Sequence, residues 1–283
     1  MSGILPDGCR LKVHLQMPLI CNMDPPCPYC GIYRSLHSDD VPPVTDVRRW
    51  FVALDDLSRK RGPLHVACLH GEPFADRDLM RVLGRLSEHN LIDCFSNMIR
   101  TADVIRESFG VPENLWVTAS FHPHHWADVA SFAERVADVR SMGVRCDRVF
   151  LVAFPPNIPR LQGWIGELVE IGLTPYVMPF TGELSGARYP EAHTDEEWSL
   201  ISRYLAERFG EDGFMTSRKG RLCRAGIDIV FVDTDGAVRS CPSGYAHDLG
   251  NLLDGTMRTL DAPRPCLAPH CQCPDLWRLI ISD

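Results

Sequence analysis

Short apolar runs alternate along residues 10–210 with segments whose apolar residues recur at helical spacing. The apolar runs predict strands, and the helical spacing predicts helices. The predicted strands cover residues 10–20, 64–69, 91–95, 115–121, 148–154 and 174–180. The predicted helices cover residues 45–61, 76–89, 127–142, 160–171 and 195–209, with one more after Ser96-Asn97. Six such units predict an α/β fold with a parallel sheet, either a partial barrel or an open doubly wound sheet.

Polar segments follow several predicted strands, at the end where parallel α/β folds place their chemistry. These segments are residues 21–30, Gly71-Glu72-Pro73, Ser96-Asn97 and residues 120–125. Because the carboxyl ends of parallel strands meet at one edge of the sheet, we expect these four segments to form one site.

The pattern changes after Gly220, where short β-rich runs replace the alternation of strands and helices. Residues 227–232 and 237–239 flank Asp233-Thr234-Asp235-Gly236, and an Asp-Gly turn between two such runs predicts a hairpin. We therefore expect a first domain of residues 1–212 and a small second domain of residues 213–283. A segment of about 70 residues has a weak core, so a metal centre is expected to stabilise the second domain.

The composition is typical of a globular protein, since 45% of the 283 residues are hydrophobic and 23% are charged. The net charge of −8 and the lack of a long Lys/Arg run argue against nucleic acid as a bulk partner. No apolar run approaches the roughly 18 residues of a membrane span, and residues 1–12 lack the pattern of a signal peptide. We therefore expect a cytoplasmic protein.

Eight of the twelve cysteines fall in two groups. The first group is Cys21, Cys27 and Cys30, and the second is Cys223, Cys241, Cys266, Cys271 and Cys273. In a reducing compartment, clustered thiols indicate metal ligands rather than disulfides. Among the solitary cysteines, Cys68 and Cys94 lie in apolar runs and are expected to be small core residues.

The first group has the spacing C-x5-C-x2-C in a loop with three prolines. Three thiolates can hold a four-iron cluster and leave one iron open to another ligand. A zinc site needs a fourth nearby Cys or His, and the loop contains none. The loop therefore favours an iron–sulfur cluster with one open iron, with zinc or chance proximity of thiols as the alternatives.

Together these residues resemble the radical S-adenosylmethionine enzymes. The cysteine motif of that family is usually C-x3-C-x2-C with an aromatic residue before the last cysteine, a position that Tyr29 occupies here. Gly71-Glu72-Pro73 is similar to the family's Gly-Gly-Glu-Pro motif, with His70 in place of the first glycine. The resemblance covers about residues 10–210, and it implies a partial (β/α)6 TIM-like barrel.

The resemblance implies a 4Fe–4S cluster on the three loop cysteines, whose open iron chelates S-adenosylmethionine. Reductive cleavage then gives methionine and a 5′-deoxyadenosyl radical, with the electron supplied by a reductant such as flavodoxin or ferredoxin. By the same resemblance, Tyr29 lies against adenine and the backbone of residues 71–73, including Glu72, receives the methionine ammonium. Asn97 and Ser120 are placed to meet the ribose or the carboxylate, with ordinary strand-end capping as the alternative.

His70, His122 and His124 are candidates for substrate contact. The last two share one loop with His125, and protonation near physiological pH suits imidazoles to proton transfer. A metal site at these histidines is a further alternative, although the sequence shows no acidic partner, and a plain polar loop is another.

The second domain resembles the Twitch form of the SPASM extensions in this family. The matching features are Cys223, the hairpin ahead of Cys241, and Leu249-Gly250-Asn251-Leu252. The resemblance implies an auxiliary 4Fe–4S cluster that has Cys223 and Cys241 as ligands. Two of Cys266, Cys271 and Cys273 would complete the set. A structural zinc ribbon is the alternative.

These features favour an oxidative radical enzyme of natural-product biosynthesis that acts on a small molecule or a short peptide. The radical abstracts a substrate hydrogen, and the auxiliary cluster accepts the electron of the product radical. Residues 1–9 alone precede the first strand, so the N-terminal peptide-binding domain of larger SPASM enzymes is expected to be absent.

Two alternatives stay open from the sequence. One is a peptide-modifying enzyme that crosslinks or epimerises its substrate, where epimerisation needs a hydrogen donor such as the thiol of Cys68, Cys94 or Cys146. The other is a non-enzymatic metal-binding or maturation scaffold. The Gly71-Glu72-Pro73 turn argues against a scaffold, since a carrier has no need of an S-adenosylmethionine site.

Overall fold

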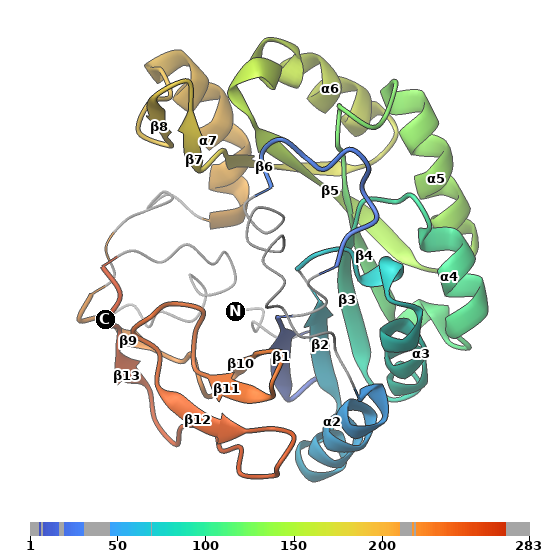
Figure 1. The fold of residues 1–283 in the computed structure, drawn as a ribbon, viewed down its shortest axis with the longest axis vertical. Helices are drawn as coiled ribbons and strands as arrows, with labels where there is room; N and C mark the ends of the chain where they lie inside the picture. Colours follow the sequence, from blue (N-terminus) through green and yellow to red (C-terminus); the bar gives the residue numbers. More distant parts are fainter. Residues whose placement is uncertain are drawn as a thin grey trace.

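The predicted strands form one curved parallel sheet in the computed structural model (Figure 1). The structure describes residues 6, 8–16, 20–30, 46–68, 70–209, 217 and 219–269. The strands are β1 (Leu11–Leu15), β2 (Leu64–Cys68), β3 (Leu91–Ser96), β4 (Leu115–Ser120), β5 (Arg145–Ala153) and β6 (Thr174–Pro179). The helices are α2 (Val47–Arg61), α3 (Arg77–Leu86), α4 (Thr101–Ser108), α5 (Val129–Ser141), α6 (Ile158–Glu170) and α7 (Asp195–Phe209). The expected partial (β/α)6 barrel is confirmed.

The strand order is β12-β11-β10-β1-β2-β3-β4-β5-β6, so β1 to β6 lie side by side in chain order. On its other side, β1 pairs in parallel with β10 (Ile229–Val232). The chain then turns into β11 (Ala237–Arg239), which pairs antiparallel with β10 and with β12 (Asp248–Asn251). The predicted hairpin is confirmed, and it extends the sheet of the barrel itself.

Side-chain contacts also attach the C-terminal segment to the first helix. The guanidinium of Arg49 in α2 donates from Nε and Nη2 to the Leu253 carbonyl oxygen, at 3.3 and 3.2 Å. Arg61 Nη2 donates to Thr259 Oγ1 at 3.0 Å. The domain boundary near residue 212 stays a prediction, and the main sheet contains strands from both sides of it.

Short elements complete the described chain. Two small sheets pair β7 (Gly182–Leu184) with β8 (Ala187–Tyr189), and β9 (Leu222–Cys223) with β13 (Arg264–Pro265). The 3₁₀ helices are η1 (Pro73–Ala75), η2 (Pro112–Asn114) and η3 (Pro155–Asn157). Across the described ranges, no helix combines the length and the apolar character that crossing a membrane requires.

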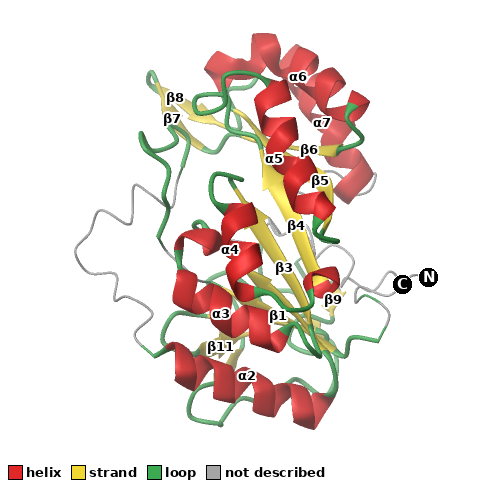
Figure 2. Cartoon of the chain, turned by 90° about the vertical axis from the view of Figure 1, so that its right-hand side faces the viewer, coloured by secondary structure: helices red, strands yellow, loops and turns green. Residues whose placement is uncertain are grey.

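Alternate residues of a strand point to opposite faces of the sheet, and the residues that point to the outer face here are apolar. Their side chains pack under the helices that line this face, and α3, α4 and α5 stand in front of the strands in Figure 2. Cys68, Cys94 and Cys146 belong to this core and are at most 1% exposed. The expectation that Cys68 and Cys94 are core residues is therefore confirmed.

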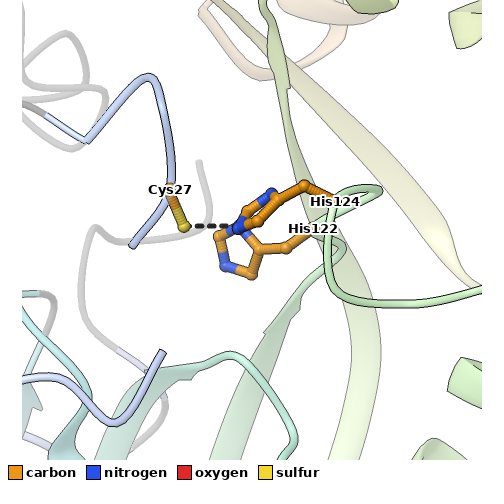
Figure 3. A group of neighbouring side chains, drawn as sticks. All are labelled: Cys27, His122 and His124. Carbon is orange, nitrogen blue, oxygen red and sulfur yellow. Dashed lines mark hydrogen bonds between the residues drawn. The ribbon is translucent and has the colours of Figure 1, made fainter. Parts of the chain in front are cut away.

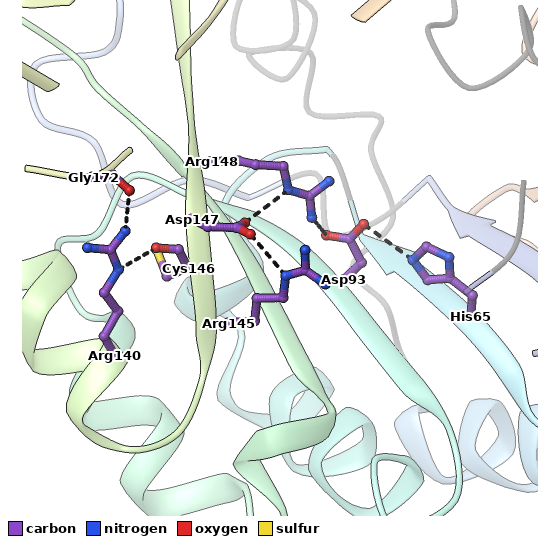
Figure 4. A network of polar contacts seen from close by, with 8 residues as sticks. All are labelled: His65, Asp93, Arg140, Arg145, Cys146, Asp147, Arg148 and Gly172. Atoms are coloured by element: carbon purple, nitrogen blue, oxygen red, sulfur yellow. Dashed lines mark hydrogen bonds and ion pairs between the residues drawn. The ribbon is translucent and has the colours of Figure 1, made fainter. Parts of the chain in front are cut away.

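The inner face of the sheet carries a buried His65–Asp93 pair, which Figure 4 shows within a larger network of polar contacts. His65 Nε2 of β2 lies 3.3 Å from Asp93 Oδ2 of β3, and Arg148 Nη2 of β5 lies 3.6 Å from Asp93 Oδ1. The Asp93–Arg148 contact passes over β4, on the face opposite the apolar core, because Asp93 alternates with the core residues Ile92 and Cys94. Burial alone would raise the pKa of Asp93, but the His65 hydrogen bond and the charges of Arg148, His65 and Lys12 outweigh burial and hold that pKa well below its usual range.

We expect the Asp93→Asn variant to lose about 2–4 kcal/mol of unfolding free energy, because the substitution removes the buried carboxylate that His65, Arg148 and Lys12 stabilise. The exposed Arg77–Glu107 pair, at 3.4 Å, supplies a matched control. Glu107→Gln should cost less than about 1 kcal/mol. Urea unfolding at pH 7 measures both values, and equal losses in the two variants would show that the network contributes nothing beyond a surface ion pair.

Candidate cofactor and metal sites

Three half-buried thiols gather in the loop that follows β1. Cys30 N donates to the Cys27 carbonyl oxygen at 3.1 Å, which closes the C-x2-C turn. Burial, together with the charges of Cys30 and Cys21, raises the pKa of Cys27 to about 12. A thiol whose ionisation is opposed by burial and by two neighbouring thiols suits a cationic metal centre, because a metal ion binds thiolates and relieves their repulsion. The donor set therefore fits a cluster held by Cys21, Cys27 and Cys30.

The turn after β2 is fixed to the cysteine loop and to the end of β3. Gly71 has φ +61°, a conformation that glycine adopts without strain, and the next backbone amide, Glu72 N, donates to the Ile20 carbonyl oxygen at 2.8 Å. The Glu72 carboxylate is 2% exposed and accepts hydrogen bonds from Ser96 Oγ at 3.0 Å, Asn97 N at 2.6 Å and Phe74 N at 3.2 Å. The turn is thus held on both sides, by its backbone and by its one acidic side chain.

Asn97 connects this turn to the first cysteine. Its Oδ1 accepts from Ile99 N at 3.0 Å, so its Nδ2 is the group that donates to Asn22 Oδ1 at 2.8 Å. The same Nδ2 lies 4.0 Å from Cys21 Sγ. The Asn97 side chain therefore holds the cysteine loop in place, and its expected contact with ribose or carboxylate stays a prediction.

Burial raises the pKa of Glu72 to about 7, from an ordinary value of 4.5, and outweighs its hydrogen bonds. A folded-state pKa above the unfolded value favours folding most at low pH, and the benefit is lost as the pH rises through about 7. Between pH 5 and pH 8, the unfolding free energy of the wild type should therefore fall by roughly 2–3 kcal/mol relative to Glu72→Gln. Urea unfolding of metal-free protein tests this, with Glu107→Gln as the control at an exposed carboxylate. A difference between wild type and Glu72→Gln that does not change with pH would contradict it.

The Asn22–Asn97 hydrogen bond predicts a coupling between these two residues in unfolding experiments. Alanine at either position removes the same hydrogen bond. The loss of unfolding free energy in the double variant should therefore be about 0.5–1.5 kcal/mol smaller than the sum of the losses in the two single variants. Asn114, which donates to the Ser87 carbonyl oxygen at 2.7 Å, is the control partner for Asn97. The Asn97→Ala/Asn114→Ala pair should be additive. An additive Asn22–Asn97 cycle in urea unfolding would show that the bond does not hold the loop.

His122 and His124, from the loop after β4, face Cys27 (Figure 3). His122 Nδ1 lies 3.5 Å from Cys27 Sγ and 3.0 Å from Tyr29 Oη. One ligand atom from each of Cys27, His122 and His124 can be chosen so that all three lie within 4.8 Å of one another, so this group could also hold a metal ion. Both ring nitrogens of His124 are buried without a hydrogen-bond partner in the described chain. Burial, with the charges of His124 and His125, lowers the pKa of His122 to about 3.

The remaining candidates lie at neighbouring strand ends. Ser120 is the last residue of β4 and is buried. His70 is half-buried, and burial lowers its pKa, although the nearby Asp233 carboxylate acts in the opposite direction. Asp233 follows β10, so His70 lies at the junction of the barrel and the hairpin. Whether Ser120 and His70 contact a cofactor or a substrate stays a prediction.

Three cysteines of the second group also come together. The pairing of β9 with β13 places Cys223 opposite Arg264, and Cys266 N donates to the Arg221 carbonyl oxygen at 2.8 Å. Burial and the charges of Cys266 and Cys241 raise the pKa of Cys223. This donor set fits an auxiliary metal centre for the same reason as the first group. The other two candidates, Cys271 and Cys273, lie outside the described residues.

Sequence reasoning missed the polar inner face of the sheet. Lys12 and His14 alternate with buried apolar residues in β1, and His65 does so in β2. A period of two that places polar residues inside buried strands was the available signal. His14 also stacks on Phe231 of β10, with ring centroids 4.7 Å apart. Phe231 in turn belongs to the small apolar cluster that packs against Cys223 and Cys241.

No protein-family model matches this chain, and no curated protein matches it either. Among solved structures, native anSMEcpe with bound AdoMet is similar with a TM-score of 0.58 and 18% sequence identity. That match covers 87% of this chain and 79% of anSMEcpe. BtrN in complex with AdoMet and 2-DOIA aligns with a TM-score of 0.40 and 11% identity, over 89% of this chain and 81% of BtrN. The first similarity shows that the chain shares its fold with anSMEcpe.

Proposed function

We propose that this chain is a radical S-adenosylmethionine enzyme. The proposal rests on the loops at the strand ends, which hydrogen bonds connect to one another. Cys21, Cys27 and Cys30 follow β1, and Asn97 and Glu72 bind their loop to the glycine turn after β2. The fold on which these loops stand is shared with a protein solved with AdoMet bound, which supports the same ligand here.

The chain's own residues would bind and orient the cofactors. Cys21, Cys27 and Cys30 would hold a 4Fe–4S cluster, and the backbone of residues 71–73 would receive the ammonium of S-adenosylmethionine. When bound, these cofactors supply reductive cleavage to methionine and a 5′-deoxyadenosyl radical that abstracts a substrate hydrogen, with the electron drawn from a flavodoxin or ferredoxin. Tyr29 packs against His122, His124 and Phe154. Its ring would lie against adenine.

The second cysteine group would hold an auxiliary 4Fe–4S cluster that accepts the electron of the product radical. The attachment of Cys223 and Cys241 supports this role, since both pack against residues of β10, which pairs with β1 of the barrel. The net reaction is then a two-electron oxidation of a small molecule or a short peptide.

Epimerisation is less well supported than oxidation. It requires a thiol that can reach a substrate radical at the inner face or at the strand ends. Cys68, Cys94 and Cys146 lie in the core formed with the outer helices and are at most 1% exposed. None of these three candidates can therefore serve as the hydrogen donor in the described conformation.

Anaerobic purification tests the proposal. The wild type should be brown, hold about eight irons per chain, and cleave S-adenosylmethionine when reduced. Cys27→Ala should abolish cleavage, whereas Cys9→Ala, at a half-buried thiol outside both groups, should retain it. A colourless zinc protein that cannot be reconstituted would support a metal-binding scaffold instead.

Cys241→Ala separates the two cysteine groups. This variant should lose about four irons but still form 5′-deoxyadenosine, because the first group is intact. Oxidation of the substrate should stop. Continued oxidation by Cys241→Ala protein would exclude the second group as the electron acceptor.

A further inference from the structure

We infer that His122 is a positioning residue that donates a hydrogen bond from Nδ1 to the Cys27 sulfur and so raises the reduction potential of the cluster held there. The inference rests on the proposed function, because it requires Cys27 to be a cluster ligand. It assigns His122 to the cofactor, whereas the sequence suggested a substrate contact.

The Nδ1 side of the His122 ring contacts the cysteine loop. Nδ1 lies 3.5 Å from Cys27 Sγ, within the range of an N–H···S bond, and 3.0 Å from Tyr29 Oη. In Figure 3, His122 reaches from the end of β4 toward Cys27 on the opposite loop. A substrate could then meet only the other nitrogen of this ring.

The ring is also held in one orientation. Backbone amides of His125 and Trp126 donate to the His122 carbonyl oxygen at 2.9 and 3.0 Å, which fixes the turn. The Tyr29 ring lies nearly parallel to His122, at an interplanar angle of 17°, and the His124 ring crosses His122 at 70°. A ring confined in this way keeps Nδ1 directed toward the Cys27 sulfur.

The chemistry of the sulfur decides which group donates. A metal-bound cysteine has lost its proton, so its sulfur can only accept a hydrogen bond. The proposed bond therefore requires the proton on His122 Nδ1, and Tyr29 Oη, 3.0 Å away, then accepts from this N–H instead of donating to the nitrogen. Hydrogen bonds to ligand sulfurs are among the features that set cluster potentials, and they favour the reduced, more negative state.

Redox titration followed by EPR tests the inference. The signal that changes on adding S-adenosylmethionine identifies this cluster and separates it from the auxiliary one. His122→Leu should shift its potential to a more negative value. His122→Asn keeps an amide donor near the position of Nδ1 and should restore much of the shift. His125→Leu changes an exposed ring of the same loop and should leave the potential unchanged.

Equal potentials in the wild type and His122→Leu would overturn the inference, and so would zinc bound by Cys27, His122 and His124 in reconstituted protein. If His122→Leu holds no cluster, pulsed EPR of wild type with ¹⁵N-labelled histidine decides the question. A weak ¹⁵N coupling that disappears in His122→Asn supports the bond, and absence of the coupling in wild type rejects it. A wild type without any cluster that responds to S-adenosylmethionine would instead contradict the proposed function.

Discussion

The candidate site depends on one buried carboxylate, that of Glu72. Three donors converge on it, from the Phe74 and Asn97 amides and the Ser96 hydroxyl. A carboxylate removed from water is costly unless its oxygens accept such bonds. Burial of Glu72 therefore requires that the turn after β2 and the end of β3 are both in place. Through Asn97, the same constraint extends to Asn22 and the cysteine loop.

The curvature of the sheet is the second constraint on the site, because it separates an outer, apolar face from an inner, polar one. The strands turn their apolar side chains toward the helices and enclose Lys12, His14, His65 and Asp93 on the inner face. Because β10 pairs with β1, Phe231 becomes part of that inner face and stacks on His14. Phe231 also packs with the cluster that touches Cys223 and Cys241. Cys223 and Cys241 therefore lie against the inner side of the same sheet, although they are far in sequence from the first cysteine group.

Much of the fold could be predicted from sequence because its elements are locally encoded. The predicted strands at residues 64–69, 91–95 and 115–121 became β2, β3 and β4, and Asp235-Gly236 formed the expected hairpin turn. The pairing of β10 with β1 could not be predicted in the same way. It is a contact between distant segments, and neither periodicity nor turn chemistry specifies which strand a hairpin joins. The Asn22–Asn97 and Cys27–His122 contacts were missed for the same reason, since each joins segments at least 75 residues apart.

The stretch between Cys21 and Cys27 contains two attachment points of the cysteine loop. Two residues in this interval anchor the loop by different means. Asn22 accepts the hydrogen bond from Asn97, and Met23 is 3% exposed, so it adds apolar burial. A loop lengthened without such contacts would gain conformational freedom, and its thiols would lose part of their fixed arrangement. Here Asn22 and Met23 supply a polar and an apolar attachment beside the first cysteine. The loop is therefore held close to Cys21 by Asn97 and close to Cys27 by His122, before any metal contributes to its order.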